Sequence, residues 1–236
     1  MIIRPLTIII RQLISYILRW AQDNHYYTMI PDIVPPTATL LFILESPHKE
    51  ELQHGYPASG RTGREMSKII LGRTDIPLSL IIKCPCISSC LNTFNMNHAG
   101  IMNISTSPLQ ESCYSGQFSN RKPLNMNALN YVRKDLQKVY RTNRKTFLDP
   151  QHESAQNQIF LDFQKRLDYV INKNNISKIV PCGHFASYFF NLYCNESTSM
   201  ANITIINNVP HPAVTGGGWS NLPSTIAASL QALHLP

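Results

Sequence analysis

The feature that most constrains the fold of this chain is a continuous apolar run at residues 38–44, Ala-Thr-Leu-Leu-Phe-Ile-Leu. Turn-forming residues precede it at 31–36, and the polar segment Glu45-Ser46-Pro47-His48 follows it. An unbroken apolar run of this length between turn signals is typical of a strand that is buried on both faces. Such strands belong to parallel sheets that are covered by helices. The run therefore predicts a central strand of an α/β protein.

Strand and helix patterns alternate through the rest of the chain. Apolar residues recur every three or four positions over 129–139 and 160–171, which predicts two amphipathic helices. Further helices are predicted at 65–71, 184–193 and 223–233, and further strands at 101–104, 176–181 and 203–206. This alternation predicts a three-layer α/β/α sandwich around a central parallel four-stranded sheet. We expect a single domain over 1–236, with an N-terminal helical extension at 1–36.

Positive charge exceeds negative charge, with 21 Lys and Arg against 14 Asp and Glu, a formal net charge of +7. Only 15% of residues are charged and 43% are hydrophobic, which excludes a disordered polyelectrolyte. The surplus favours an anionic partner, with nucleic acid ahead of a membrane surface. Arginines interrupt the apolar residues of 1–20, so no run approaches the roughly 20 residues of a membrane span. No targeting signal is visible, and we expect a cytoplasmic monomer that binds no membrane.

Cysteines cluster in one segment, Lys83-Cys84-Pro85-Cys86-Ile87-Ser88-Ser89-Cys90. With Cys113 as a fourth ligand, this cluster is a candidate for zinc or an iron–sulfur centre. The spacing lacks the paired C-x2-C knuckles of common zinc sites. A disulfide framework is not expected in a chain of this length without a signal peptide. We therefore favour reduced cysteines and no cofactor, with the metal site as the alternative.

Polar residues with chemical potential follow the predicted strands. Glu45 and His48 follow the first strand, Asn103 lies within the short apolar segment at 101–104, and His211 follows the last strand. In parallel sheets, ligands bind beyond the carboxyl ends of the strands. The sequence therefore predicts that these four side chains meet at one edge of the sheet.

Four segments, taken in order, resemble the uracil-DNA glycosylase superfamily. Leu44-Glu45-Ser46-Pro47, followed by Gly55-Tyr56-Pro57 and Gly60-Arg61-Thr62-Gly63-Arg64, is similar to the first motif of the family 4 enzymes, Gly-Glu-Ala-Pro-Gly and then Gly-x-Pro-Phe-x-Gly-Arg-x-Gly. Residues 101–104 are placed like the strand that carries the base-reading Asn of that family. Residues 179–186 resemble its strand-Gly-x-x-Ala step into a helix, and 209–213 resemble its His-Pro-Ser motif. The resemblance runs from residue 39 to about 220, and it implies the α/β/α fold of that superfamily.

The resemblance implies an enzyme that flips a nucleotide out of DNA and hydrolyses the bond between its base and sugar. The base leaves as an anion while the sugar becomes cation-like, so the site needs a carboxylate near the sugar and a donor near the base. Glu45 is expected to position water and stabilise the sugar, and His211 to donate to the base carbonyl. Asn103 can read one base edge, because its amide is both donor and acceptor.

DNA-backbone contacts are expected from residues beside these motifs and from a basic stretch at 121–145, which holds eight Lys and Arg against Asp135 alone. Trp219 is a candidate wedge into the base stack, or alternatively an anchor that ties a glycine-rich loop to the core. The basic stretch can equally be a solvated helix face. The expected DNA-binding residues are Ser46, Arg61, Arg64, Thr215, Gly216, Gly217 and Trp219.

The proposed catalytic residues also have structural alternatives. Glu45 can be a carboxylate that caps a loop, although a Glu that closes a buried apolar strand is unusual. His211 can be a loop histidine that is bonded to the backbone. Asn103 alone would be a turn residue more often than a ligand.

Departures from the family 4 pattern concern the base pocket. Ala58 stands where the family has a Phe that stacks on uracil, which removes stacking of about 1–3 kcal/mol and opens space. His48 stands where family 4 has Gly, and Ala213 replaces the Ser of His-Pro-Ser. A wider pocket with the polar His48 suits an enlarged C5-modified pyrimidine. The resemblance then implies excision of a base such as glucosylated hydroxymethylcytosine from phage DNA, as in bacterial anti-phage glycosylases of this superfamily.

Other functions remain open on the sequence. One alternative is uracil-DNA glycosylase in base-excision repair of damaged double-stranded DNA. Another is a non-catalytic DNA-binding relative that keeps the fold and the basic surface. A third is a hydrolase of nucleosides or nucleotides, which would share the glycosidic chemistry but would need no basic surface.

Overall fold

The apolar run at 38–44 forms the central strand β1 (Leu40–Leu44), whose five residues are all buried. The computed structural model describes residues 29–84, 96–139, 149–197, 200, 202–213 and 218–234. Within them β1 pairs with β2 (Ala99–Asn103) on one side and with β3 (Lys178–Pro181) on the other. The short strand β4 (Thr204–Ile205) completes a four-stranded, all-parallel sheet of order β2-β1-β3-β4. The predicted α/β class with a parallel four-stranded sheet is confirmed.

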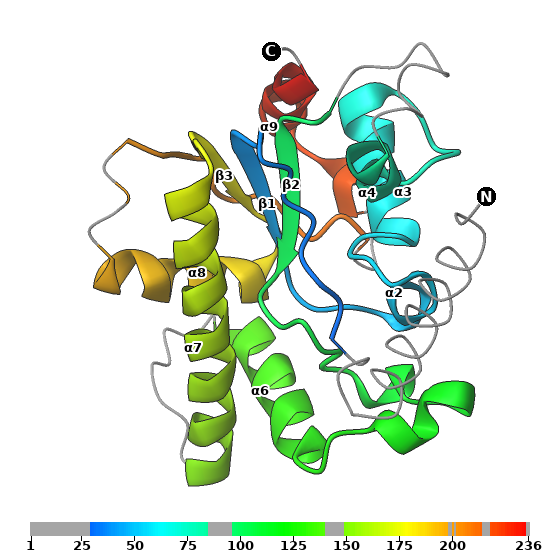
Figure 1. Cartoon of the computed structure of the whole chain (residues 1–236), viewed down its shortest axis with the longest axis vertical. Coiled ribbons are helices and arrows are strands. Elements are labelled where there is room, and N and C mark those ends of the chain that lie inside the picture. Colours follow the sequence, from blue (N-terminus) through cyan, green and yellow to red (C-terminus); the bar gives the residue numbers. More distant parts are fainter. Residues whose placement is uncertain are drawn as a thin grey trace, which may run out of the picture.

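The side chains of the central strands alternate between two apolar layers, as a strand requires. Leu41 and Ile43 pack into a cluster with helices α6 (Met126–Val139), α7 (Pro150–Lys173) and α8 (His184–Glu196). Phe42 and Leu44 pack on the opposite face, in a cluster with α3 (Arg61–Leu71), α4 (Leu78–Lys83) and α9 (Ser224–Gln231). Figure 1 shows the two groups of helices on either side of the sheet. The sheet is therefore flanked by helices on both faces, as a three-layer sandwich requires.

Local signals in the sequence account for several helix ends. Short α2 (Lys49–His54) and α3 end at Gly55 and Gly72, both of which adopt the left-handed conformation that glycine tolerates best. Helix α7 begins after Asp149, whose side chain accepts a hydrogen bond from the Gln151 amide. Four short 3-10 helices complete the described elements: η2 (Glu111–Cys113), η3 (Gly116–Arg121), η4 (Gly218–Asn221) and η5 (Ala232–His234).

The N-terminal segment differs from the predicted helical extension where it can be compared. Residues 1–28 lie outside the described residues, and residues 29–36 form no helix. Ile33 instead makes an antiparallel bridge with Ile101 on the outer edge of β2. Prolines at 31, 35 and 36 disfavour a helix here because each lacks a backbone N–H. Within the described ranges, no helix has the length and apolar character to cross a membrane.

Candidate functional site

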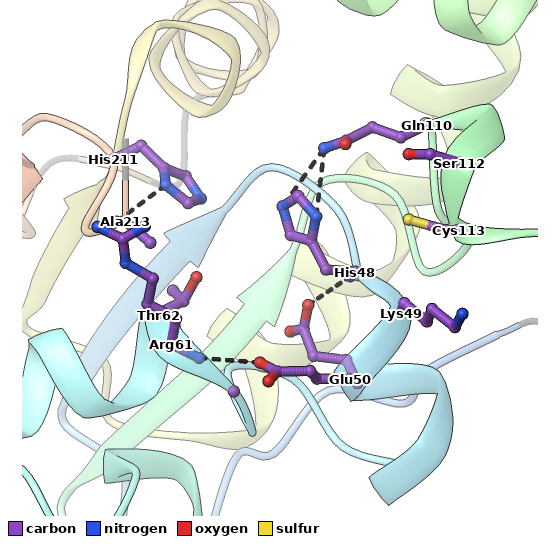
Figure 2. A pocket seen from close by; sticks show the side chains of 12 residues that line it. His48, Lys49, Glu50, Arg61, Thr62, Gln110, Ser112, Cys113, His211 and Ala213 are labelled. Atoms are coloured by element: carbon purple, nitrogen blue, oxygen red, sulfur yellow. Dashed lines mark hydrogen bonds between the residues drawn. The ribbon is translucent and has the colours of Figure 1, made fainter. Parts of the chain in front are cut away.

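The carboxyl ends of the strands gather the predicted polar residues at one edge of the sheet. Parallel register places Asn103, the last residue of β2, opposite Leu44, and Glu45 follows directly. His211 arrives by a bridge between Cys182, which follows β3, and Val209. His48 and His211 line a cavity of about 340 Å³ between the starts of α2 and α3 and the segment at 110–113 (Figure 2). The predicted meeting of these residues at one sheet edge is what the strand register produces.

His211 is held as a neutral hydrogen-bond donor. Burial is the largest cause that lowers its pKa to about 4, and the charge of Glu45 opposes the shift. Its Nδ1 accepts a hydrogen bond of 3.3 Å from the backbone N–H of Ala213. The proton of the neutral ring therefore sits on Nε2. No described residue accepts from Nε2, so this N–H is available to a ligand.

Glycine at position 183 allows this placement of His211. The Gly183 amide donates to the Val209 carbonyl at 2.8 Å, which joins the start of α8 to the loop that carries the histidine. Gly183 has φ +92°, and a Cβ there would lie 3.0 Å from the Cβ of His211. Both the backbone conformation and the space favour glycine at this position.

His48 faces His211 across the cavity. The two rings lie edge to face with centroids 6.5 Å apart. Figure 2 shows both imidazoles turned toward the same space, with the amide of Gln110 over His48. Gln110 Nε2 is 3.3 Å from Nδ1 and 3.4 Å from Nε2 of that ring. Burial is the main cause that lowers the pKa of His48, so the wall of the cavity is polar but neutral here.

Glu45 is paired by helix α6 rather than left free. Its Oε1 forms a short ion pair with Arg133 Nε, and its Oε2 accepts from Gln137 Nε2 at 3.0 Å. The side chains of Glu45 and Arg133 are 9% and 18% exposed. Arg133 is therefore not a surface phosphate contact, as the basic stretch suggested, because its guanidinium turns inward to the carboxylate.

Asn103 has a buried side chain whose amide has no partner. The residue is 1% exposed, and neither Oδ1 nor Nδ2 makes a hydrogen bond within the described structure. An unsatisfied buried polar group costs about 1–3 kcal/mol. The hydroxyl of Ser46 is likewise buried without a partner. Orphaned donors and acceptors of this kind mark places where a ligand can supply what the protein lacks.

Glu51 is a site residue that the sequence analysis missed. It lines the cavity from α2, and its carboxyl accepts hydrogen bonds from the backbone amides of His48, at 2.5 Å, and Ala58. Desolvation is the main cause that raises its pKa to about 7. The spacing His48-x-x-Glu51 matches a capping box, a signal that could have located it, although His is not a usual cap.

The expected base contact at Ala58 is not supported. The residue is fully buried against the α3 and α4 side of the sheet and does not line the cavity. Its φ of +50° is unusual for alanine. Its N–H is bonded to Glu51 and its carbonyl accepts from the Ser79 hydroxyl at 2.8 Å. Ala58 therefore shapes the loop backbone and does not contact the cavity.

Of the expected DNA contacts, Arg61 is placed at the surface. It lines the cavity with an exposed side chain, whereas Arg64 lies 3.8 Å from Glu50. Trp219 as a DNA wedge is wrong: the ring is fully buried, tilted against Phe42, and donates to a backbone carbonyl. Buried Ser46 also cannot reach a phosphate in this conformation. Thr215, Gly216 and Gly217 lie outside the described residues.

The cysteines of the expected metal site lie only partly within the described residues. Cys86 and Cys90 lie outside the described residues, while Cys84 and Cys113 are free thiols. Burial raises the pKa of Cys113, which disfavours the thiolate that a metal needs. Within the described part of the chain, no cluster of three or more His, Cys, Asp or Glu could hold a metal ion.

This sheet edge offers a neutral imidazole N–H at a cavity lined by polar residues, together with a buried carboxylate and an unpartnered amide that do not line the cavity. A neutral N–H donor of this kind can stabilise negative charge that develops on a ligand. Neither a family model nor a curated protein matches the chain.

Proposed function

We propose that this protein is a DNA glycosylase related to the uracil-DNA glycosylases, which hydrolyses the bond between a flipped base and its sugar. The observation that carries the proposal is the neutral His211 in the cavity wall, whose Nε2–H has no partner among the described residues. An anionic leaving base needs a donor where its charge develops. A neutral donor in a buried site meets this need without burying an unpaired cation.

Glu45 is assigned to the water nucleophile. A carboxylate offers about four acceptor positions, and Arg133 and Gln137 occupy two of them. The remaining positions can accept from a water molecule. Arg133 weakens the attraction between Glu45 and a sugar cation, because the opposite charge lies in contact. Positioning of water is therefore the larger part of its proposed role.

Asn103 is assigned to the base edge. Its unpartnered donor and acceptor match the alternating pattern of a pyrimidine edge. Because Glu45 is 7% and Asn103 1% exposed, a nucleotide reaches them only when side chains at the cavity move. Such tightening and opening around substrate is common in enzymes that close on a ligand.

The proposed substrate class is an enlarged, C5-modified pyrimidine in phage DNA, such as glucosylated hydroxymethylcytosine. The support is the cavity beside His211, where the polar side chains of His48 and Gln110 form one wall. Hydroxyl groups of a sugar substituent can bond to such imidazole and amide groups. Exposed Arg61 at the cavity supplies a cation for the DNA backbone.

The ion pair between Arg133 and Glu45 favours a second candidate, a non-catalytic DNA-binding relative. In that case the ion pair of Glu45 only stabilises the packing of α6 against the end of β1, and His211 donates no proton or hydrogen bond in a reaction. DNA binding without abasic product on any substrate supports this candidate.

Variants of the two catalytic residues test the proposal. His211→Ala and Glu45→Gln should each lower the rate of abasic-site formation by about 100-fold or more, as expected for loss of a transition-state contact. His54→Ala is the matched control, since this exposed histidine lies on α2 outside the cavity. Folded variants that both keep wild-type rates would contradict the site assignment.

A further inference from the structure

Backbone groups at the outer edge of β2, beside Asn103, have no part in the roles proposed above. Strand β2 is an edge strand, and the Ile33 bridge covers it only at Ile101, with reciprocal hydrogen bonds of 2.9 and 2.7 Å. Backbone groups of a strand alternate in direction, so Asn103 points its N–H and C=O to the same outer edge as Ile101. These groups need partners, because unpaired buried backbone groups are costly.

The segment that contains Ile33 cannot pair with Asn103 as a regular antiparallel strand would. Extending the antiparallel bridge by two residues brings Pro31 opposite Asn103. Proline has no N–H, so it cannot donate to the carbonyl of Asn103. Side chains therefore have to replace the missing strand.

Arg166 and Asp32 supply both missing partners. Arg166 Nη2 donates to the carbonyl of Asn103 at 3.0 Å and to that of Ile104 at 2.7 Å. Asp32 Oδ1 accepts from the Asn103 N–H at 3.3 Å, and its Oδ2 pairs with Arg166 Nη1 at 2.7 Å. The remaining Nε of Arg166 pairs with Asp162 at 2.8 Å. One ion pair thus provides a partner for both the N–H and the C=O of Asn103 at this edge.

We propose that Arg166 and Asp32 are positioning residues that hold Asn103 ready to bind the base; this inference rests on the proposed function. The buried amide of Asn103 lacks partners, so fraying of the strand end toward water would relieve its cost. The hydrogen bonds of Arg166 and Asp32 to the main chain of Asn103, called the clamp below, oppose that fraying. The binding energy of the base is then not consumed in ordering the Asn103 side chain, which is the advantage of a preorganised site.

Arginine is required for this geometry. Its guanidinium presents donors in a fixed plane, and here they reach two carboxylates and two carbonyls. Lysine keeps the positive charge but offers a single point of attachment. Arg166→Lys therefore keeps the positive charge at this position but removes the set of hydrogen bonds that forms the clamp. Asp162→Asn is the matched control, because it weakens a partner of the same arginine that does not touch Asn103.

Hydrogen exchange tests the clamp without reference to activity. In folded Arg166→Lys, the backbone N–H of Asn103 should exchange about tenfold faster or more than in wild type, as expected for a looser strand end. Asp162→Asn should leave this exchange nearly unchanged. Asp32→Asn serves as the milder variant if Arg166→Lys does not fold. The proposed clamp is contradicted if the exchange rate of the Asn103 N–H is unchanged in the folded Arg166→Lys or Asp32→Asn variant. It is also contradicted if Asp162→Asn raises this rate equally.

Kinetics test whether the clamp acts through Asn103. Arg166→Lys should lower kcat for base excision about tenfold with little change in KM for DNA. In an Asn103→Ala background the same substitution should have little further effect, because the two act as one unit. Additive effects overturn the positioning role and leave Arg166 a purely structural residue. If wild-type protein excises no base from any DNA, the proposed function fails, and the exchange data still decide whether Asn103 is clamped.

Discussion

Replacement of Glu51 by glutamine should change how stability depends on pH. Glu51 is 4% exposed, and its two described partners are backbone amides rather than a cation. Burial therefore raises its pKa from 4.5 to about 7. Between these values the unfolded chain has lost the proton while the folded chain keeps it, so the free energy of unfolding falls as pH rises.

The size of this effect follows from the two pKa values. Each pH unit between 4.5 and about 7 lowers the free energy of unfolding by about 1.4 kcal/mol. The loss therefore reaches about 3 kcal/mol above pH 7 and is absent below pH 4.5. Glu51→Gln removes this loss. It also costs about 1–3 kcal/mol at every pH, because one backbone amide loses its acceptor.

Urea unfolding followed by circular dichroism from pH 4 to pH 8 measures the effect. The variant should be less stable than wild type at pH 4 and should recover about 3 kcal/mol relative to it by pH 8. His211→Gln provides the opposite case, since its folded pKa of about 4 gives stability that is lost as pH falls from 6.5 to 4. A difference between wild type and Glu51→Gln that stays constant over this range would refute the reasoning from burial.

Three further substitutions test other parts of the account. Trp219→Ala should lower the free energy of unfolding by about 3–5 kcal/mol in urea, because the ring is a core anchor; near-wild-type stability contradicts this. Gly183→Ala should cost about 1–3 kcal/mol and slow base excision, since it strains the backbone and crowds His211; an unchanged rate argues against that contact. Arg133→Met should destabilise the fold by about 3 kcal/mol, because the buried charge of Glu45 loses its cation and keeps only Gln137, yet it should keep more excision activity than Glu45→Gln. Equal activities would make Glu45 structural.

The sheet could be predicted from the sequence because its strands carry local signals. Residues 40–44 are buried on both faces in an unbroken apolar run, and the stripes of α6 and α7 repeat at helical spacing. The strand predicted at 203–206 is only Thr204–Ile205 in the structure, because this edge strand pairs with β3 over two residues. Residues 29–36, the described end of the expected helical extension over 1–36, form no helix because their prolines favour extended backbone.

The site was predictable only in part, because its electrostatics depend on residues distant in sequence. Strand ends placed Glu45, Asn103 and His211 at one edge, as parallel topology dictates. Nothing local indicates that Arg133, 88 positions after Glu45, turns inward to pair with it. The burial of Trp219 likewise depends on Phe42, which is far away in the chain.

The most direct test of the proposed glycosylase activity is a search for abasic sites after incubation of the purified chain with three DNAs. These are uracil-containing DNA, ordinary genomic DNA and phage DNA with glucosylated hydroxymethylcytosine. We expect abasic sites in the phage DNA, none in ordinary DNA, and a loss of the signal with His211→Ala. Release of uracil with the modified phage DNA left intact contradicts the proposed substrate, and abasic sites in none of the three contradict the glycosylase itself.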